Sequence, residues 1–160
     1  MKIRKVGIVA NTEKEKIAEY AGALKEWLAA KGVEVFIENE IAAKIGARAG
    51  FDLKTIAVKT QLVTVMGGDG TMLRTARCLS KYNVPIVGIN MGNFGYLTEV
   101  NLNEMNSALE VILSGNYLTE KRMMLDVSIS QGPKIINAGV VLNDAVIDRG
   151  NLSRIVELET

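Results

Sequence analysis

Short apolar runs alternate with helix-like segments over the first part of the chain, and this alternation restricts the fold most. The runs are rich in β-branched residues, as expected for strands buried on both faces of a parallel sheet. Strands that alternate with helices form such a sheet between helices, in a three-layer α/β domain. Residues 39–60 are ambiguous and could carry a short helix and a loop. The predicted strands are residues 3–10, 33–38, 62–66 and 86–90, and the predicted helices are residues 13–31, 71–82 and 102–113.

After the last of these helices the pattern changes to a period of two. In MLDVSIS (124–130), apolar and polar residues alternate, which is typical of a half-buried strand. Two more extended runs, 135–147 and 154–159, follow the turn sequences QGPK and DRGN, so three antiparallel strands are predicted. We therefore expect an α/β nucleotide-binding domain over residues 1–118 and the start of an incomplete antiparallel β domain over residues 119–160.

Composition excludes several kinds of chemistry. The sequence has no histidine and one cysteine, Cys78, so it contains no Ser-His-Asp triad, no internal disulfide and no zinc site of several cysteines. The 19 basic and 18 acidic residues give a net charge of +1, which provides no bulk attraction to nucleic acid or to a membrane. No apolar run approaches the ~20 residues of a membrane span, and the N-terminus becomes charged too early for a signal peptide. We expect a cytoplasmic protein with small-molecule partners.

The glycine-rich sequence GGDGT (67–71) stands between a predicted strand and a predicted helix. The free N–H groups and the helix dipole at such a junction bind phosphate, and glycines permit positive φ angles and the close approach of a ligand. We expect phosphate or nucleotide binding here, and a plain turn is the alternative. Asp69 could hold a bridging Mg²⁺, accept a proton from an attacking hydroxyl, or cap the helix. The sequence is neither a Walker A loop nor a GxGxxG fingerprint.

Two further stretches are candidates for ligand contacts. Residues 88–96, GINMGNFGY, follow the fourth predicted strand and should line the same crevice. Their aromatic rings either stack on a nucleobase or anchor the loop. Asn143 and Asp144 stand in an otherwise apolar run, where two adjacent polar side chains are costly unless they have partners. This pair marks either a turn or bulge, or a contact with the polar edge of a ligand.

These pieces, in this order, resemble the motifs of the NAD kinase family: GGDGT (67–71), GINMGNFGYLTE (88–99), Asn143-Asp144, and RMML (122–125) at the start of the family's second domain. Lipid kinases and phosphofructokinases share GGDGT, whereas GINMGNFGYLTE is the specific part. The resemblance covers nearly the whole chain. It implies an α/β domain followed by a β-sandwich-like domain. It also implies transfer of a phosphoryl group from ATP, or from polyphosphate in some members, to the adenosine-ribose 2′-hydroxyl of NAD.

The resemblance also implies roles for individual residues. Asp69 matches the family's proton acceptor, and Tyr96 stands where the family has an aromatic residue near the adenine. The implied NAD-binding residues are Asp69, Gly70, Arg74, Tyr96, Asn143, Asp144 and Arg154, and the phosphate-binding residues are Gly67, Gly68, Gly70 and Thr71. Mg²⁺ or another divalent cation is the implied cofactor, with ATP and NAD as substrates and no metal ligand assigned. The complete protein is expected to be a homodimer or homotetramer.

Members of the family continue with a GSTAY-type motif and a return of the chain to the first domain. We therefore expect this chain to be the N-terminal portion of a NAD kinase, whose NAD site would lack part of its wall and whose own activity could be lost. Three alternatives stay open. The strands after residue 118 could pack on the α/β domain of a complete chain. The protein could be a lipid kinase of the diacylglycerol or sphingosine type, or a nucleotide-binding module without turnover.

Overall fold

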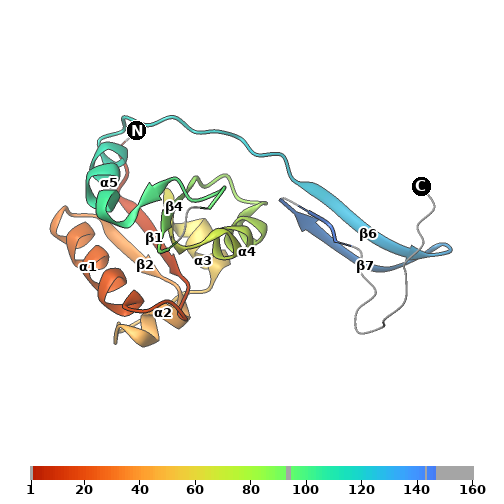
Figure 1. Ribbon diagram of the computed structural model, residues 1–160, viewed down its shortest axis with the longest axis horizontal. Coiled ribbons are helices and arrows are strands. Elements are labelled where there is room, and N and C mark those ends of the chain that lie inside the picture. Colours follow the sequence, from red (N-terminus) through yellow and green to blue (C-terminus); the bar gives the residue numbers. More distant parts are fainter. Residues whose placement is uncertain (1, 93–94, 143, 147–160) are drawn as a thin grey trace. The chain divides into compact units, whose positions relative to one another are not determined.

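The computed structural model describes residues 2–92, 95–142 and 144–146 (Figure 1). The chain divides into two compact units, Met1–Arg122 and Met123–Thr160, and each is described here by itself. This division falls a few residues after the domain boundary that the sequence predicts. In the described part of the chain, no helix is both long and apolar enough to cross a membrane.

The first unit is built on a parallel five-stranded sheet. Its strands are β1 (Lys5–Ala10), β2 (Glu34–Ile37), β3 (Leu62–Gly67), β4 (Ile86–Asn90) and β5 (Val100–Asn101), in the order β2-β1-β3-β4-β5. All neighbouring strands pair in parallel, and every residue of β3 is buried, as expected for a central strand covered on both faces. The chain leaves β1 toward β2 and leaves β3 toward β4, in opposite directions. The carboxyl ends of β1 and β3 are therefore a topological switch point, where open α/β sheets bind ligands.

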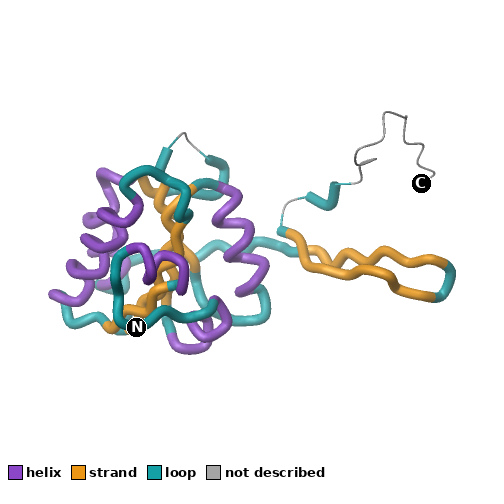
Figure 2. The backbone as a smooth tube through the Cα atoms, turned by 90° about the horizontal axis from the view of Figure 1, so that it is seen from below, coloured by secondary structure: helices purple, strands orange, loops and turns teal. Residues whose placement is uncertain are grey.

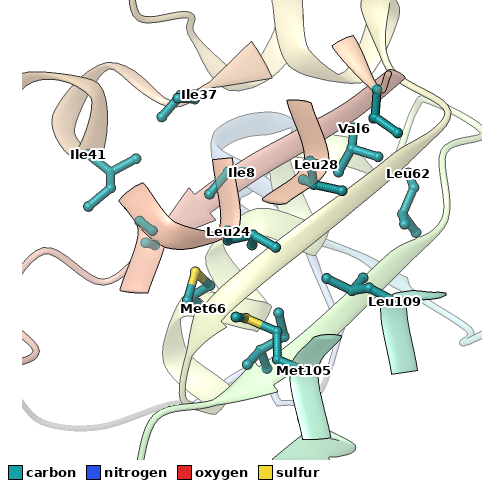
Figure 3. Packing of buried hydrophobic residues seen from close by; sticks show 14 of the residues in the cluster. Val6, Ile8, Leu24, Leu28, Ile37, Ile41, Leu62, Met66, Met105 and Leu109 are labelled. Atoms are coloured by element: carbon teal, nitrogen blue, oxygen red, sulfur yellow. The ribbon is translucent and has the colours of Figure 1, made fainter. Parts of the chain in front are cut away.

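Helices cover both faces of this sheet (Figure 2). They are α1 (Ile17–Ala30), α2 (Asn39–Lys44), α3 (Leu53–Lys59), α4 (Asp69–Leu79), the 3-10 helix η1 (Leu102–Glu104) and α5 (Met105–Leu113). On one face α1, α2 and α5 pack against the strands in a cluster that includes Leu24, Ile41 and Leu109 (Figure 3). On the other face α3 and α4 contribute Ile56 and Leu79 to a second cluster. The predicted three-layer α/β architecture is confirmed.

Two elements of the first unit were not predicted as such. The ambiguous segment 39–60 contains α3 in addition to α2, and α3 begins after Asp52, whose carboxylate accepts a hydrogen bond from the Thr55 N–H at 2.7 Å. This N-cap is a local signal that the sequence analysis did not use. β5 was missed because a strand of two residues has no periodicity; only its pairing with β4 defines it.

The bounds of two predicted helices also differ from the structure. The helix predicted over residues 13–31 begins only at Ile17, because Lys16 has a left-handed backbone with φ 56°, which a right-handed helix cannot include. The helix predicted over residues 71–82 begins earlier, with Asp69 as its first residue. This earlier start places the aspartate of GGDGT inside the first turn.

The second unit contains an antiparallel hairpin of β6 (Leu125–Gln131) and β7 (Lys134–Val141). The predicted antiparallel pairing is confirmed, although the strand predicted over residues 135–147 ends at Val141. The third predicted strand, residues 154–159, lies outside the described residues. Four large apolar side chains of the hairpin are at least half exposed, those of Leu125, Ile129, Ile135 and Ile136. An isolated two-stranded hairpin is marginally stable. The described residues of this unit therefore bury little core of their own.

Candidate active site

A cleft of about 550 Å³ lies at the switch point between β1 and β3. Its walls are the end of β1 with the segment that follows it (10–14), the N-cap and first turn of α4 (Gly68, Gly70 and Thr71), Glu40 and Arg74. The cleft is where strand order predicts a ligand site, because both β1 and β3 end at it.

GGDGT forms the junction between β3 and α4. β3 ends at Gly67, Gly68 is the N-cap of α4, and no side chain caps the helix. Asp69 is therefore not the N-cap, and the capping alternative is wrong. Gly68, Gly70 and Thr71 all line the cleft, so the first turn of α4 borders it. Free N–H groups and the positive end of the helix dipole make such a turn suitable for an anion.

The glycines of this junction supply space rather than unusual backbone angles. Among the described glycines, positive φ angles occur at Gly32, Gly46, Gly115 and Gly132. None belongs to GGDGT, so its glycines do not use the positive φ angles that glycine permits. A Cβ on Gly67 would lie 2.7 Å from the Thr71 Oγ1 atom, so only glycine permits this approach of β3 to α4. A Cβ on Gly68 or Gly70 would meet nothing within 4 Å, so these two residues leave open space beside the cleft.

The Asp69 carboxylate is held by the loop that follows β4. Its Oδ2 atom accepts a hydrogen bond from the Tyr96 N–H at 2.8 Å, and its Oδ1 atom accepts one from the Leu97 N–H at 3.0 Å. Hydrogen bonds to an ionised acceptor are about twice as strong as those between neutral groups. The two glycine-rich loops that the sequence predicted to share one crevice are thus joined through Asp69, which stays half-buried.

The Tyr96 side chain does not anchor this loop. It is 97% exposed, so its ring is accessible to a ligand while its backbone N–H binds Asp69. The loop is instead stabilised by Asn90 at the end of β4, whose Oδ1 atom accepts a hydrogen bond from the Gly92 N–H at 2.9 Å. Phe94, the other aromatic residue of the motif, lies outside the described residues.

Arg74 is bound to a residue that the sequence analysis missed. Its Nη1 and Nη2 atoms donate to the two carboxylate oxygens of Glu38 at 2.8 and 3.1 Å. Hydrogen bonding to Glu38 raises the pKa of Arg74 above its usual value, so its positive charge is permanent. Glu38 directly follows β2 and is 5% exposed. A charged residue at the end of the predicted strand 33–38 was the signal that could have identified it.

Charges of both signs border the cleft. Lys14 and Arg74 are its cations, and Glu13 and Glu40 are its carboxylates. Within the described ranges, no group of three or more His, Cys, Asp or Glu residues could hold a metal ion.

The remaining candidate residues belong to the second unit. Asp144 is exposed there, whereas Asn143 and Arg154 lie outside the described residues. The roles that the resemblance implies for these three residues stay predictions.

The family model of the ATP-NAD kinase N-terminal domain matches residues 6–117, which include both glycine-rich motifs. The chain belongs to this family. It is 37% identical over 159 residues to the NAD kinase of Natranaerobius thermophilus and 40% identical over 158 residues to that of Geotalea daltonii. Each alignment covers 99% of this chain and 56% of the relative, so the chain spans about half the length of the curated relatives it matches.

A solved structure shares the fold. The crystal structure of yeast NADH kinase complexed with NADH superposes with a TM-score of 0.72 and 17% identity, covering 89% of this chain and 48% of that one. The family match, rather than GGDGT alone, places the chain in the ATP-NAD kinase family and not among the lipid kinases.

Proposed function

We propose that the protein phosphorylates NAD, transferring a phosphoryl group from ATP, or from polyphosphate, to the 2′-hydroxyl of the adenosine ribose to give NADP. The observation that carries this proposal is the placement of Asp69 in a chain of the ATP-NAD kinase family. Its carboxylate is fixed by two backbone N–H groups and stands at the start of a helix whose first turn borders a cleft. Phosphoryl transfer requires mainly positioning, neutralisation of charge and a proton acceptor.

In this reaction Asp69 accepts the proton of the ribose hydroxyl. The hydroxyl O–H bond breaks as a carboxyl O–H bond forms, and the ribose oxygen forms a bond to the terminal phosphorus of the donor while the bond to the leaving phosphate breaks. Each carboxylate oxygen has lone pairs beyond the one that accepts the N–H bond, so the hydrogen bonds to Tyr96 and Leu97 leave room for the proton.

The donor phosphates would lie against the first turn of α4. Gly67 permits the close strand–helix junction, and Gly68, Gly70 and Thr71 border the cleft. Lys14 would supply positive charge, whereas the charge of Arg74 is balanced by its ion pair with Glu38. Mg²⁺ usually binds to substrate phosphates and one or two carboxylates, which fits Glu13 or Glu40 as its protein ligand. The ion supplies charge neutralisation on the phosphates when it is bound.

The NAD contacts that the resemblance implies are Asp69, Gly70, Arg74, Tyr96, Asn143, Asp144 and Arg154. The exposed Tyr96 ring supports a stacking contact with the adenine. We further propose that the complete protein acts in the cytoplasm as a homodimer or homotetramer, without nucleic-acid or membrane partners. The net charge of +1 supports the absence of a polyanionic partner.

The test is NADP formation from NAD, ATP and Mg²⁺ by the protein expressed in full from its gene. Asp69→Asn keeps the size of the side chain and should lower kcat by about 10²–10⁴-fold, because a general base contributes that much. Asp52→Asn is the matched control, since Asp52 is an exposed helix cap outside the cleft, and its activity should equal that of the wild type. Full activity of Asp69→Asn would refute the assignment of the base, and a wild-type protein that forms no NADP would refute the kinase.

A further inference from the structure

We infer that the segment after β4, Gly95–Thr98, positions the Asp69 carboxylate for proton acceptance, with Gly95 and Thr98 as its positioning residues. The inference rests on the proposed function of Asp69, and it assigns a role to side chains and a glycine that need not touch either substrate. Three observations on this segment carry it.

The first observation is that consecutive N–H groups bind different oxygens of the same carboxylate. Tyr96 N–H donates to Oδ2 and Leu97 N–H donates to Oδ1. One hydrogen bond would leave the carboxylate free to rotate about its last side-chain torsion, whereas two bonds to two oxygens fix its plane. The direction in which the remaining lone pairs point is therefore determined by this loop.

The second observation concerns Gly95. A Cβ atom at this position would lie 2.8 Å from the Asp69 Cγ atom, closer still to its Oδ1 atom, and 3.0 Å from the Thr98 Oγ1 atom. Any side chain at residue 95 would therefore push the carboxylate or the loop away. Glycine is needed here for space, because the carboxylate occupies the position that a Cβ would take.

The third observation is the hydroxyl of Thr98. Thr98 is 4% exposed, and its Oγ1 atom is buried without a hydrogen-bond partner in the described structure. Thr98 also packs tightly on β4, since its Cα and Cγ2 atoms lie 3.0 Å from the position of a Cβ on Gly88. A buried hydroxyl without a partner destabilises the fold, and valine would fill the same space without this cost.

The position of the hydroxyl indicates what it is for. The Thr98 Oγ1 atom and the Asp69 carboxylate border the same point above Gly95. Once Asp69 has taken the proton, its carboxyl O–H needs an acceptor, and the neighbouring backbone N–H groups can only donate. The Thr98 hydroxyl has acceptor lone pairs and makes no hydrogen bond in the described structure, so it is available to accept a hydrogen bond from the protonated carboxyl.

The test compares Gly95→Ala and Thr98→Val with Gly22→Ala, a control in α1 whose Cβ would meet nothing within 4 Å. The protein expressed in full is assayed for kcat and for KM with NAD and ATP. Gly95→Ala should lower kcat about tenfold or more with little change in the KM for ATP, because it displaces the base and leaves the first turn of α4 in place. Thr98→Val should unfold at the same or a higher temperature than the wild type and still lose about three- to tenfold in kcat, which Thr98→Ser should restore.

A second readout does not depend on activity. Hydrogen exchange of the Tyr96 and Leu97 amides should be protected in the wild type and in Gly22→Ala, and faster in Gly95→Ala. Unprotected amides in the wild type would overturn the inference even if Gly95→Ala failed to fold. Wild-type kcat in both Gly95→Ala and Thr98→Val would overturn it while the kinase proposal stood. A wild type that forms no NADP would overturn the kinase proposal and this inference with it.

Discussion

The ion pair between Arg74 and Glu38 should respond asymmetrically to mutation, with Arg74→Met destabilising the first unit more than Glu38→Gln. The Glu38 side chain is 7% exposed, whereas that of Arg74 is 42% exposed. Removing the guanidinium leaves a buried carboxylate without its two donors and shielded from water. Removing the carboxylate leaves a guanidinium at the wall of the cleft, where it can turn into solvent.

The exposure of each partner determines how much free energy of unfolding its variant is expected to lose. Breaking a buried pair costs about 3–5 kcal/mol when the remaining charge stays buried. For Arg74→Met we expect a loss near the low end, about 3 kcal/mol, because Glu38 lies close to the cleft. For Glu38→Gln we expect about 1–2 kcal/mol, since the glutamine oxygen still accepts one hydrogen bond and Arg74 regains water. Methionine matches arginine in helix propensity, so α4 itself should not contribute.

Urea unfolding of both single variants and the double variant measures these losses. Trp27 is the single tryptophan of the sequence and packs against the core on α1, so its fluorescence reports on the first unit. The double variant should be less destabilised than the sum of the singles, because it leaves neither charge stranded. Equal losses in the two single variants, or strict additivity in the double variant, would refute the argument from burial.

Two further predictions concern the stability of the first unit. The hydrogen bond from the Thr55 N–H lowers the pKa of Asp52 in the folded protein. The cap therefore stabilises α3 fully at a pH above the unfolded-state pKa of about 3.9, and this stabilisation is lost as the pH falls through the lower folded-state pKa. Between about pH 5 and pH 2 the free energy of unfolding should therefore fall more in the wild type than in Asp52→Asn. Parallel plots of this free energy against pH for the two proteins would contradict the prediction. Leu24→Ala, at a fully buried position, should lower the free energy of unfolding by about 2–5 kcal/mol. The control Val111→Ala, on the exposed side of α5, should change it little. Similar urea midpoints for the two variants would contradict the described core.

Local patterns in the sequence were sufficient for most of the first unit. β1 and β3 are continuous apolar runs with β-branched residues, and α1 has one apolar face, so each element carries its own periodic signal. The signal failed where an element is short. α3 is seven residues long and β5 is two, and neither is long enough to show a period.

The sequence also identified the candidate site by its chemistry, because three glycines and an aspartate between a strand and a helix are unusual for a turn alone. It did not predict which groups surround that aspartate. Asp69 meets the N–H groups of Tyr96 and Leu97, which are 27 and 28 residues away in the chain, and Arg74 meets Glu38 across 36 residues.

There is a physical reason why the sequence determined some of these features and the tertiary structure determined the others. Residue types, spacing and periodicity act over a few residues, so the sequence by itself determined the elements, the glycine-rich junction and the family resemblance. The neighbours of Asp69 and Arg74 depend on strand order, which brings the carboxyl ends of β2, β3 and β4 to the same edge of the sheet. Only the tertiary structure therefore decided that Gly95 must lack a side chain, that Glu38 binds Arg74, and that a buried Thr98 hydroxyl lies beside the candidate base.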